Sequence, residues 1–176
     1  MKRQILFFTL LVVLHFIFAA CGKKENTDTN SGGVELYLLD SYKTTNSSYQ
    51  IDEGTIVTKS QPLLTYSNFL FYDSSKYTFH ISDAAKATIK DMDFSVHGIA
   101  FAIKANNVLI YSGYFWPSYS SASCSWVVID PIMLGSGNEL NVELGYPGLI
   151  EGTVIPDKRN DQRILDIFAK DNKLIK

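Results

Sequence analysis

Apolar and polar residues alternate along the chain in short runs that are typical of β-strands. Valine, isoleucine, leucine and aromatic residues gather in runs that Asp, Ser, Asn, Gly or Pro interrupt, and such punctuation marks strands joined by turns. The predicted strands are Val34 to Leu39, Gly54 to Thr58, Leu63 to Asp73, Tyr77 to Ser82, Gly98 to Lys104, Val108 to Phe115, Ser125 to Ile129 and Glu139 to Leu144. Between two of them, Asn106 and Asn107 predict a tight hairpin turn, because asparagine tolerates the left-handed backbone conformation that such turns need.

Two segments instead have the spacing of apolar residues that is typical of helices. After Ser82, a good N-cap, Ala85, Ile89 and Met92 lie three or four residues apart and predict one short amphipathic helix. The segment from Asp157 to Lys170 repeats this spacing near the end of the chain and predicts a second helix.

The predicted fold class is α+β. Strands and helices do not alternate in the βαβ order that a doubly wound parallel sheet requires. We therefore expect an antiparallel sheet with a short helix between strands, in the order strand, helix, hairpin, followed by a C-terminal helix.

The first twenty residues predict an export signal, which is removed from the mature protein. Lys2 and Arg3 precede an apolar stretch from Ile5 to Phe18, and Ala19 and Ala20 supply the small side chains that a signal peptidase needs. The stretch is short for a helix that crosses ~30 Å of hydrocarbon. An ordinary secretory signal and an uncleaved anchor are the alternatives to a lipoprotein signal.

The residues around the cleavage site, FAAC ending at Cys21, resemble the lipobox of bacterial lipoproteins. The resemblance implies that Cys21 is lipidated and holds the mature protein on a membrane of the cell envelope, outside the cytoplasm. Residues 22–33, GKKENTDTNSGG, have the composition of a flexible tether, with a reach of ~17–20 Å. We therefore expect a signal peptide in residues 1–20, a lipidated cysteine and tether in residues 21–33, and a single domain in residues 34–176.

Cysteine content and net charge limit the fold and the partners. The chain has two cysteines, so lipidation of Cys21 leaves Cys124 without a disulfide partner, and the domain must rely on its hydrophobic core. Removing Lys2 and Arg3 with the signal lowers the 16 basic residues to 14, against 18 acidic ones, which gives a mature net charge of −4. Basic residues do not cluster in the domain, so we do not expect it to bind nucleic acid.

The order of the central elements resembles that of a protein-export domain. A strand (YTFHIS), a helix (SDAAKATIKDM) and a hairpin (IAFAIKANNVLIYSGYFW) follow one another between about Phe69 and Asp130. This order is similar to the head subdomain of the periplasmic region of the SecD/SecDF subunits, and the tail of the segment is similar to small Bacteroidetes-type lipoproteins. The resemblance implies a scaffold that binds extended polypeptide, without the motor activity that depends on membrane-spanning helices. Function does not follow from a shared fold alone.

An aromatic, hydroxyl-rich segment between Tyr111 and Trp126 is the most unusual part of the domain. Tyr114, Trp116, Tyr119 and Trp126 are set among serines, a mixture typical of surfaces that recognise peptides or sugars and equally suited to a core. The binding hypothesis requires at least two of Trp116, Tyr119 and Trp126 to be exposed on one face. We therefore expect a non-enzymatic module that binds a peptide, a glycan or a partner protein and uses no cofactor.

The alternative function is an envelope hydrolase or thiol enzyme that uses Cys124 with His80 or His97. A cysteine and a histidine are the minimum for thiol catalysis, and this hypothesis requires the thiol to lie within hydrogen-bond reach of a histidine in an open cleft. No metal site is expected, because two separated histidines lack a third ligand. Glycine-rich phosphate loops and Gly-x-Ser-x-Gly elbows are absent from the sequence.

Overall fold

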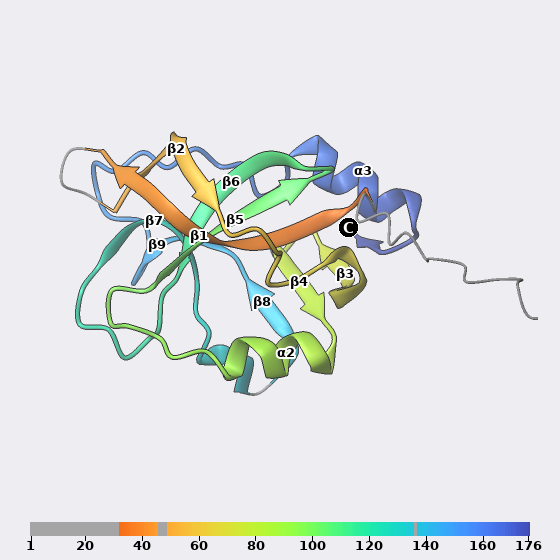
Figure 1. Cartoon of the computed structure of the whole chain (residues 1–176), viewed down its shortest axis with the longest axis horizontal. Helices are drawn as coiled ribbons and strands as arrows, with labels where there is room; N and C mark the ends of the chain where they lie inside the picture. The colour runs from red at the N-terminus through yellow and green to blue at the C-terminus, as the bar shows by residue number, and fades with distance from the viewer. Residues whose placement is uncertain (1–31, 46–48, 136) are drawn as a thin grey trace, which may run out of the picture. The chain divides into compact units, whose positions relative to one another are not determined.

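The structure, a computed structural model, describes residues 32–45, 49–135 and 137–176, which form two β-sheets and two α-helices (Figure 1). The strands are β1 (Val34–Thr44), β2 (Ile51–Thr58), β3 (Phe69–Asp73), β4 (Thr78–Ile81), β5 (Ile99–Ala105), β6 (Val108–Phe115), β7 (Cys124–Ile129), β8 (Glu139–Asn141), β9 (Glu143–Tyr146) and β10 (Leu174–Ile175). The helices are α2 (Asp83–Lys90) and α3 (Gln162–Lys170), with 3₁₀ turns at η1 (Tyr66–Asn68) and η2 (Met133–Gly135). The predicted signal peptide, the predicted lipidation site Cys21 and all but the last two residues of the predicted tether lie outside the described residues.

The larger sheet has six strands in the order β2-β1-β5-β6-β7-β9. All neighbours are antiparallel except β6 and β7, which run parallel. The predicted hairpin lies at its centre and turns at Asn106 and Asn107, whose φ angles of 49° and 65° are in the left-handed region that asparagine tolerates. The hairpin prediction is therefore confirmed.

The smaller sheet has four strands in the order β10-β3-β4-β8, with β10 parallel to β3 and the other neighbours antiparallel. The α+β class is confirmed, with a short helix between strands and a helix near the C-terminus. The sequence predicted one antiparallel sheet, whereas the described residues form two sheets with one parallel pair in each.

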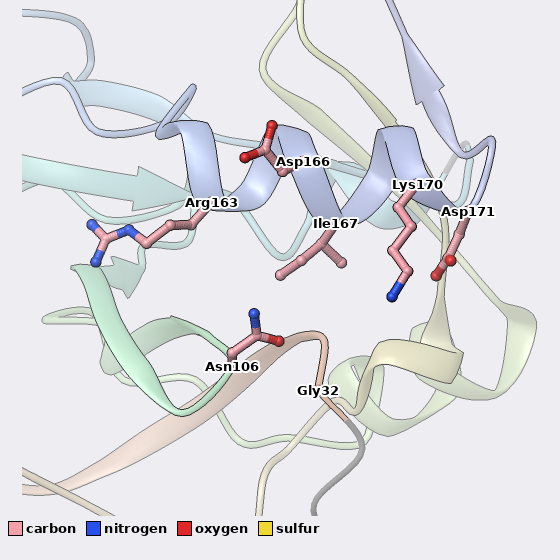
Figure 2. A pocket seen from close by; sticks show the side chains of 7 residues that line it. All are labelled: Gly32, Asn106, Arg163, Asp166, Ile167, Lys170 and Asp171. Atoms are coloured by element: carbon pink, nitrogen blue, oxygen red, sulfur yellow. The ribbon is translucent and has the colours of Figure 1, made fainter.

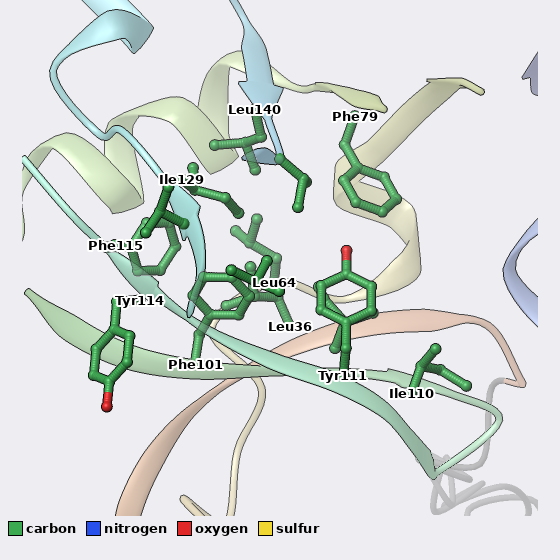
Figure 3. Close-up of a cluster of buried hydrophobic side chains, with 14 of the residues drawn as sticks. Leu36, Leu64, Phe79, Phe101, Ile110, Tyr111, Tyr114, Phe115, Ile129 and Leu140 are labelled. Carbon is green, nitrogen blue, oxygen red and sulfur yellow. The ribbon is translucent and has the colours of Figure 1, made fainter. Parts of the chain in front are cut away.

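Buried apolar side chains of both sheets meet in one cluster (Figure 3). Leu36, Phe101 and Phe115 reach it from the larger sheet, and Phe79 and Leu140 reach it from the smaller one. All five side chains are almost completely removed from water. Burial of apolar surface is the dominant favourable contribution to folding, so this cluster holds the two sheets together.

Helix α2 begins where the sequence predicted. The Ser82 hydroxyl accepts a hydrogen bond from the backbone N–H of Ala85 at 3.2 Å and caps the helix. Ala85 and Ile89 are buried on its inner face. The helix ends at Lys90, two residues before Met92, which the spacing had included.

Helix α3 covers the smaller sheet through Phe168. The helix begins at Gln162, later than the start of the predicted segment, because the Asp161 carboxylate caps it by accepting from the N–H of Arg163 at 3.0 Å. Phe168 is fully buried. Its ring lies within 6.4 Å, centroid to centroid, of the rings of Tyr66, Phe69, Tyr72 and Phe79.

The predicted strand from Glu139 to Leu144 is two strands that belong to different sheets. β8 pairs with β4 and β9 pairs with β7, and the chain changes sheets at Val142. The N–H of Val142 donates to the carbonyl of Tyr77, and its carbonyl accepts from Nη1 of Arg159 at 3.0 Å. These bonds satisfy the backbone of Val142, which pairs with a strand in neither sheet. The alternation of apolar and polar residues therefore continues from β8 into β9 although the chain changes sheets.

Strand β1 is longer than predicted and it bends. It continues through Asp40 and Ser41 to Thr44, with shifts of register against β2 between Leu39 and Ser41 and between Ser41 and Lys43. Such irregularities bend a strand and increase its twist. As a result β2 lies against β6 as well as beside β1, and a Glu53 carboxylate oxygen accepts from the backbone N–H of Ser112 at 3.0 Å.

The position of Phe168 predicts a large effect of its removal on stability. Phe168→Ala empties a fully buried site and should lower the free energy of unfolding by about 3–5 kcal/mol. The control is Phe71→Ala, the same substitution at a ring that is 46% exposed, which should cost less than about 1 kcal/mol. Denaturant unfolding measures both values, and equal losses would contradict the packing described here.

Candidate functional site

Three of the four aromatic residues predicted to bind a ligand lie in the core. Tyr114, Trp116 and Trp126 are 2%, 0% and 8% exposed, and Tyr119 alone is open, at 56%. The hypothesis required two of Trp116, Tyr119 and Trp126 on one open face, so the prediction is wrong for Tyr114, Trp116 and Trp126. The four residues do not form one binding surface.

The bend in β1 explains this burial. Tyr114 points away from the space between the sheets (Figure 3). Tyr42, in the last part of β1, and Tyr49, just before β2, place their rings at 6.0 Å and 5.9 Å from the ring of Tyr114. Tyr49 also packs on Trp116 at 4.8 Å. Tyr42 and Tyr49 therefore cover Tyr114, and Tyr49 also covers Trp116.

The indole N–H groups are satisfied inside the protein. Trp126 donates to the hydroxyl of Ser112 at 3.1 Å, and Trp116 donates to the carbonyl of Ala122 at 3.3 Å. A buried tryptophan normally has such a partner, and one that binds ligands through its edge has a free N–H. The bonds fit a core role for both residues.

Tyr119 lines an open groove of about 360 Å³ between the segment after α2 and the end of β7. The other lining residues are Lys90, Met92, Asp93, Phe94, Pro131 and Ile132. Ile132 is 46% exposed, and the neighbouring Val96 and Met133 are also open to solvent. Exposed apolar side chains gathered around a groove are typical of a surface that meets another molecule. We refer to this feature as the Tyr119 groove.

Hydrogen bonds fix the walls of the Tyr119 groove. The Tyr119 hydroxyl donates to the carbonyl of Phe94 at 2.8 Å, and the Ser120 hydroxyl donates to the carbonyl of Val96 at 2.6 Å. On the other wall, the Asp130 carboxylate accepts from the backbone N–H groups of Ser118 and Ile132. The groove is therefore formed before any ligand binds, which lowers the entropic cost of binding.

The Tyr119 groove and the start of the described chain lie at opposite ends of the central hairpin. At one end, the N–H of Asn106 in the turn donates to the carbonyl of Gly33 at 2.8 Å. At the other end, Phe94 packs its ring 5.9 Å from that of Phe115, which pairs with Ile99. The seven residues of β5 separate these ends by about 20 Å at the usual rise of a strand.

The thiol hypothesis does not meet its structural requirement. Cys124 is fully buried, and burial raises the pKa of its thiol to about 12. The two histidines have other neighbours, since Nδ1 of His97 lies 3.2 Å from the hydroxyl of Tyr49 and Nδ1 of His80 lies 3.7 Å from the carboxylate of Glu139. A buried thiol that stays protonated is not a nucleophile.

The described part of the chain offers neither a metal site nor a membrane-spanning helix. Within residues 32–45, 49–135 and 137–176, no three His, Cys, Asp or Glu side chains are placed to hold a metal ion. None of the helices within these ranges has the length and apolar character needed to cross a membrane.

Comparison with known proteins gives no relative from which a function could be transferred. The chain matches no protein-family model, no curated protein and no solved structure. The resemblance to the SecD head subdomain and to small lipoproteins therefore stays a prediction.

Most residues of the Tyr119 groove were missed by sequence reasoning. Met92 was assigned to the inner face of a helix, Phe94 and Ile132 carried no signal of their own, and Pro131 was interpreted only as the end of a strand. They come from two segments about 40 residues apart. The two segments meet only in the folded protein, so their separation in sequence hides the groove.

The burial of Cys124 predicts a slow reaction with thiol reagents. The test uses the full chain with Cys21→Ser, so that Cys124 is the remaining thiol. Because the thiolate is the reactive form, a pKa of about 12 leaves very little of it at pH 8. Labelling by a disulfide reagent, followed by absorbance, should be at least roughly a hundredfold slower in the native protein than in guanidinium. Rapid labelling without denaturant would show that the thiol is open.

Proposed function

We propose that this protein is a lipoprotein of the bacterial cell envelope that binds a partner, without catalysis, through the Tyr119 groove. The signal and lipobox-like sequence up to Cys21 support membrane attachment. The exposed apolar groove at the far end of the hairpin is the observation that carries the binding role.

The composition of the groove favours a peptide segment of a partner protein over a glycan. Sugar sites use open aromatic faces with free hydrogen-bonding groups beside them, and the hydroxyl of Tyr119 already donates to Phe94. Met92 and Ile132 instead offer adaptable aliphatic contacts for an apolar side chain. Lys90 and Asp93 lie at the same groove and carry opposite charges, which suits a peptide backbone better than a strongly charged ligand.

The position of the groove suits a protein held by its N-terminal end. The described chain begins at Gly32, beside the hairpin turn, and the groove lies about 20 Å further along the hairpin. Attachment through residues that precede Gly32 would hold the domain at the end of the hairpin that does not carry the groove. A partner can then reach it without displacing lipid.

Lipidation is tested by metabolic labelling of the full chain in a bacterial host. The wild type should incorporate labelled palmitate and sediment with membranes, and Cys21→Ser should do neither, because the thiol is the acceptor. Cys124→Ser is the matched control and should be labelled as the wild type is. Label that persists in Cys21→Ser would rule out Cys21 as the site.

The peptide-binding role is tested with a library of displayed random peptides and a panel of glycans. Peptides selected on the wild type should contain apolar side chains and bind Ile132→Asp at least about tenfold more weakly, since a charge in the groove costs about 1.4 kcal/mol or more. Val57→Asp is the control, because Val57 is 52% exposed on β2. Peptides that bind both variants equally, or glycans that are retained in place of peptides, would exclude the proposal.

A further inference from the structure

Both methionines of the predicted mature chain lie at or beside the Tyr119 groove. The chain has three methionines, and Met1 belongs to the predicted signal. Met92 lines the groove, and Met133 directly follows Ile132, which lines the other wall. A larger cleft of about 430 Å³ lies between α3 and the hairpin turn (Figure 2), and Ile167 is the only apolar side chain among the described residues that line it. Thioether sulfur therefore accompanies the apolar groove and not the charged cleft.

The two methionines differ in exposure and in surroundings. Met92 is partly buried and packs against the core, and its N–H donates to the carbonyl of Ile89 at 3.1 Å, directly after α2. Met133 is 63% exposed and lines a separate hollow of about 280 Å³ with Glu139 and Asn141. A peptide in the Tyr119 groove would therefore touch Met92, whereas Met133 serves as an internal comparison outside the groove lining.

The thioether of a methionine that lines an open groove can react with two-electron oxidants such as hydrogen peroxide. A sulfur lone pair attacks one peroxide oxygen, and the O–O bond breaks. The sulfur keeps that oxygen and loses two electrons, and the departing hydroxide takes up the remaining proton and leaves as water. The product is methionine sulfoxide, a polar side chain. Cys124 does not compete for the oxidant, because its thiol is fully buried and stays protonated.

We propose that Met92 is a site of reversible oxidation that regulates binding in the Tyr119 groove. The inference rests on the proposed peptide-binding function. The sulfoxide oxygen is a strong acceptor in an apolar lining, and the nearby Tyr119 hydroxyl already donates to the carbonyl of Phe94. A polar group covered by a peptide without a donor costs free energy, so oxidation weakens binding.

Reduction by a thiol-dependent reductase reverses the step. Two thiols become a disulfide, the sulfur of Met92 regains two electrons, and the oxygen leaves as water with the two thiol protons. The groove then recovers its apolar lining and its affinity.

The first test measures peptide affinity before and after treatment with dilute hydrogen peroxide, in the full chain with Cys21→Ser. The probe is a peptide selected on the wild type that contains neither methionine nor cysteine, followed by fluorescence anisotropy. Oxidation of Met133→Leu, which keeps Met92, should weaken binding at least about fivefold. Met92→Leu keeps Met133 and a similar apolar volume. It is the matched control and should bind equally before and after treatment.

Mass spectrometry of proteolytic fragments verifies that one oxygen atom has been added to Met92 or to Met133. An unchanged affinity of oxidised Met133→Leu, or an equal loss in oxidised Met92→Leu, would overturn the inference. A groove that binds no peptide before treatment would contradict the proposed function, and the inference would fall with it. The two failures are therefore distinguishable.

Protection of Met92 by bound peptide provides a second measurement. Saturating peptide should slow the oxidation of Met92 at least about fivefold, because susceptibility follows exposure, and should leave the rate at Met133 unchanged. Equal rates with and without peptide would exclude Met92 as the regulatory site. A methionine sulfoxide reductase with dithiothreitol should restore the affinity of oxidised Met133→Leu, and a lasting loss would contradict reversibility.

Discussion

The bend in β1 determines which side chains of this protein can meet a partner. The first half of the strand pairs with β5 and the second half with β2, and two register shifts lie in the second half. Because a strand bends and twists at such irregularities, β2 folds across the outer face of the larger sheet. Tyr114 is buried there, against the rings of Tyr42 and Tyr49.

A hydrogen bond between β2 and β6 supports the bend at a position where β7 does not pair with the backbone of Ser112. β6 and β7 pair only at Tyr114 and Phe115, so the backbone of Ser112 has no neighbour on that side. The Glu53 carboxylate accepts from the N–H of Ser112 through one oxygen and from Nζ of Lys158 through the other, at 3.0 Å and 2.7 Å. A buried N–H without an acceptor would cost free energy. Glu53 therefore ties β2 to β6 and to the segment before α3.

The sequence predicted the elements that depend on local chemistry. The Asn106–Asn107 turn and the Ser82 cap are determined by neighbouring residues, and both lie where expected. The change of sheet at Val142 depends on Arg159, which lies 17 residues further along the chain. A pattern with a period of two identifies a strand and does not identify its partner, so this break could not be predicted.

The candidate site was only partly predictable for a related reason. Tyr119 and Trp116 are three residues apart in a segment of one composition, yet one is 56% exposed and the other is fully buried. The difference arises from Tyr49, a residue distant in sequence that packs on Trp116 and not on Tyr119. Aromatic content therefore identified the correct region, and only the tertiary packing separated core residues from surface residues.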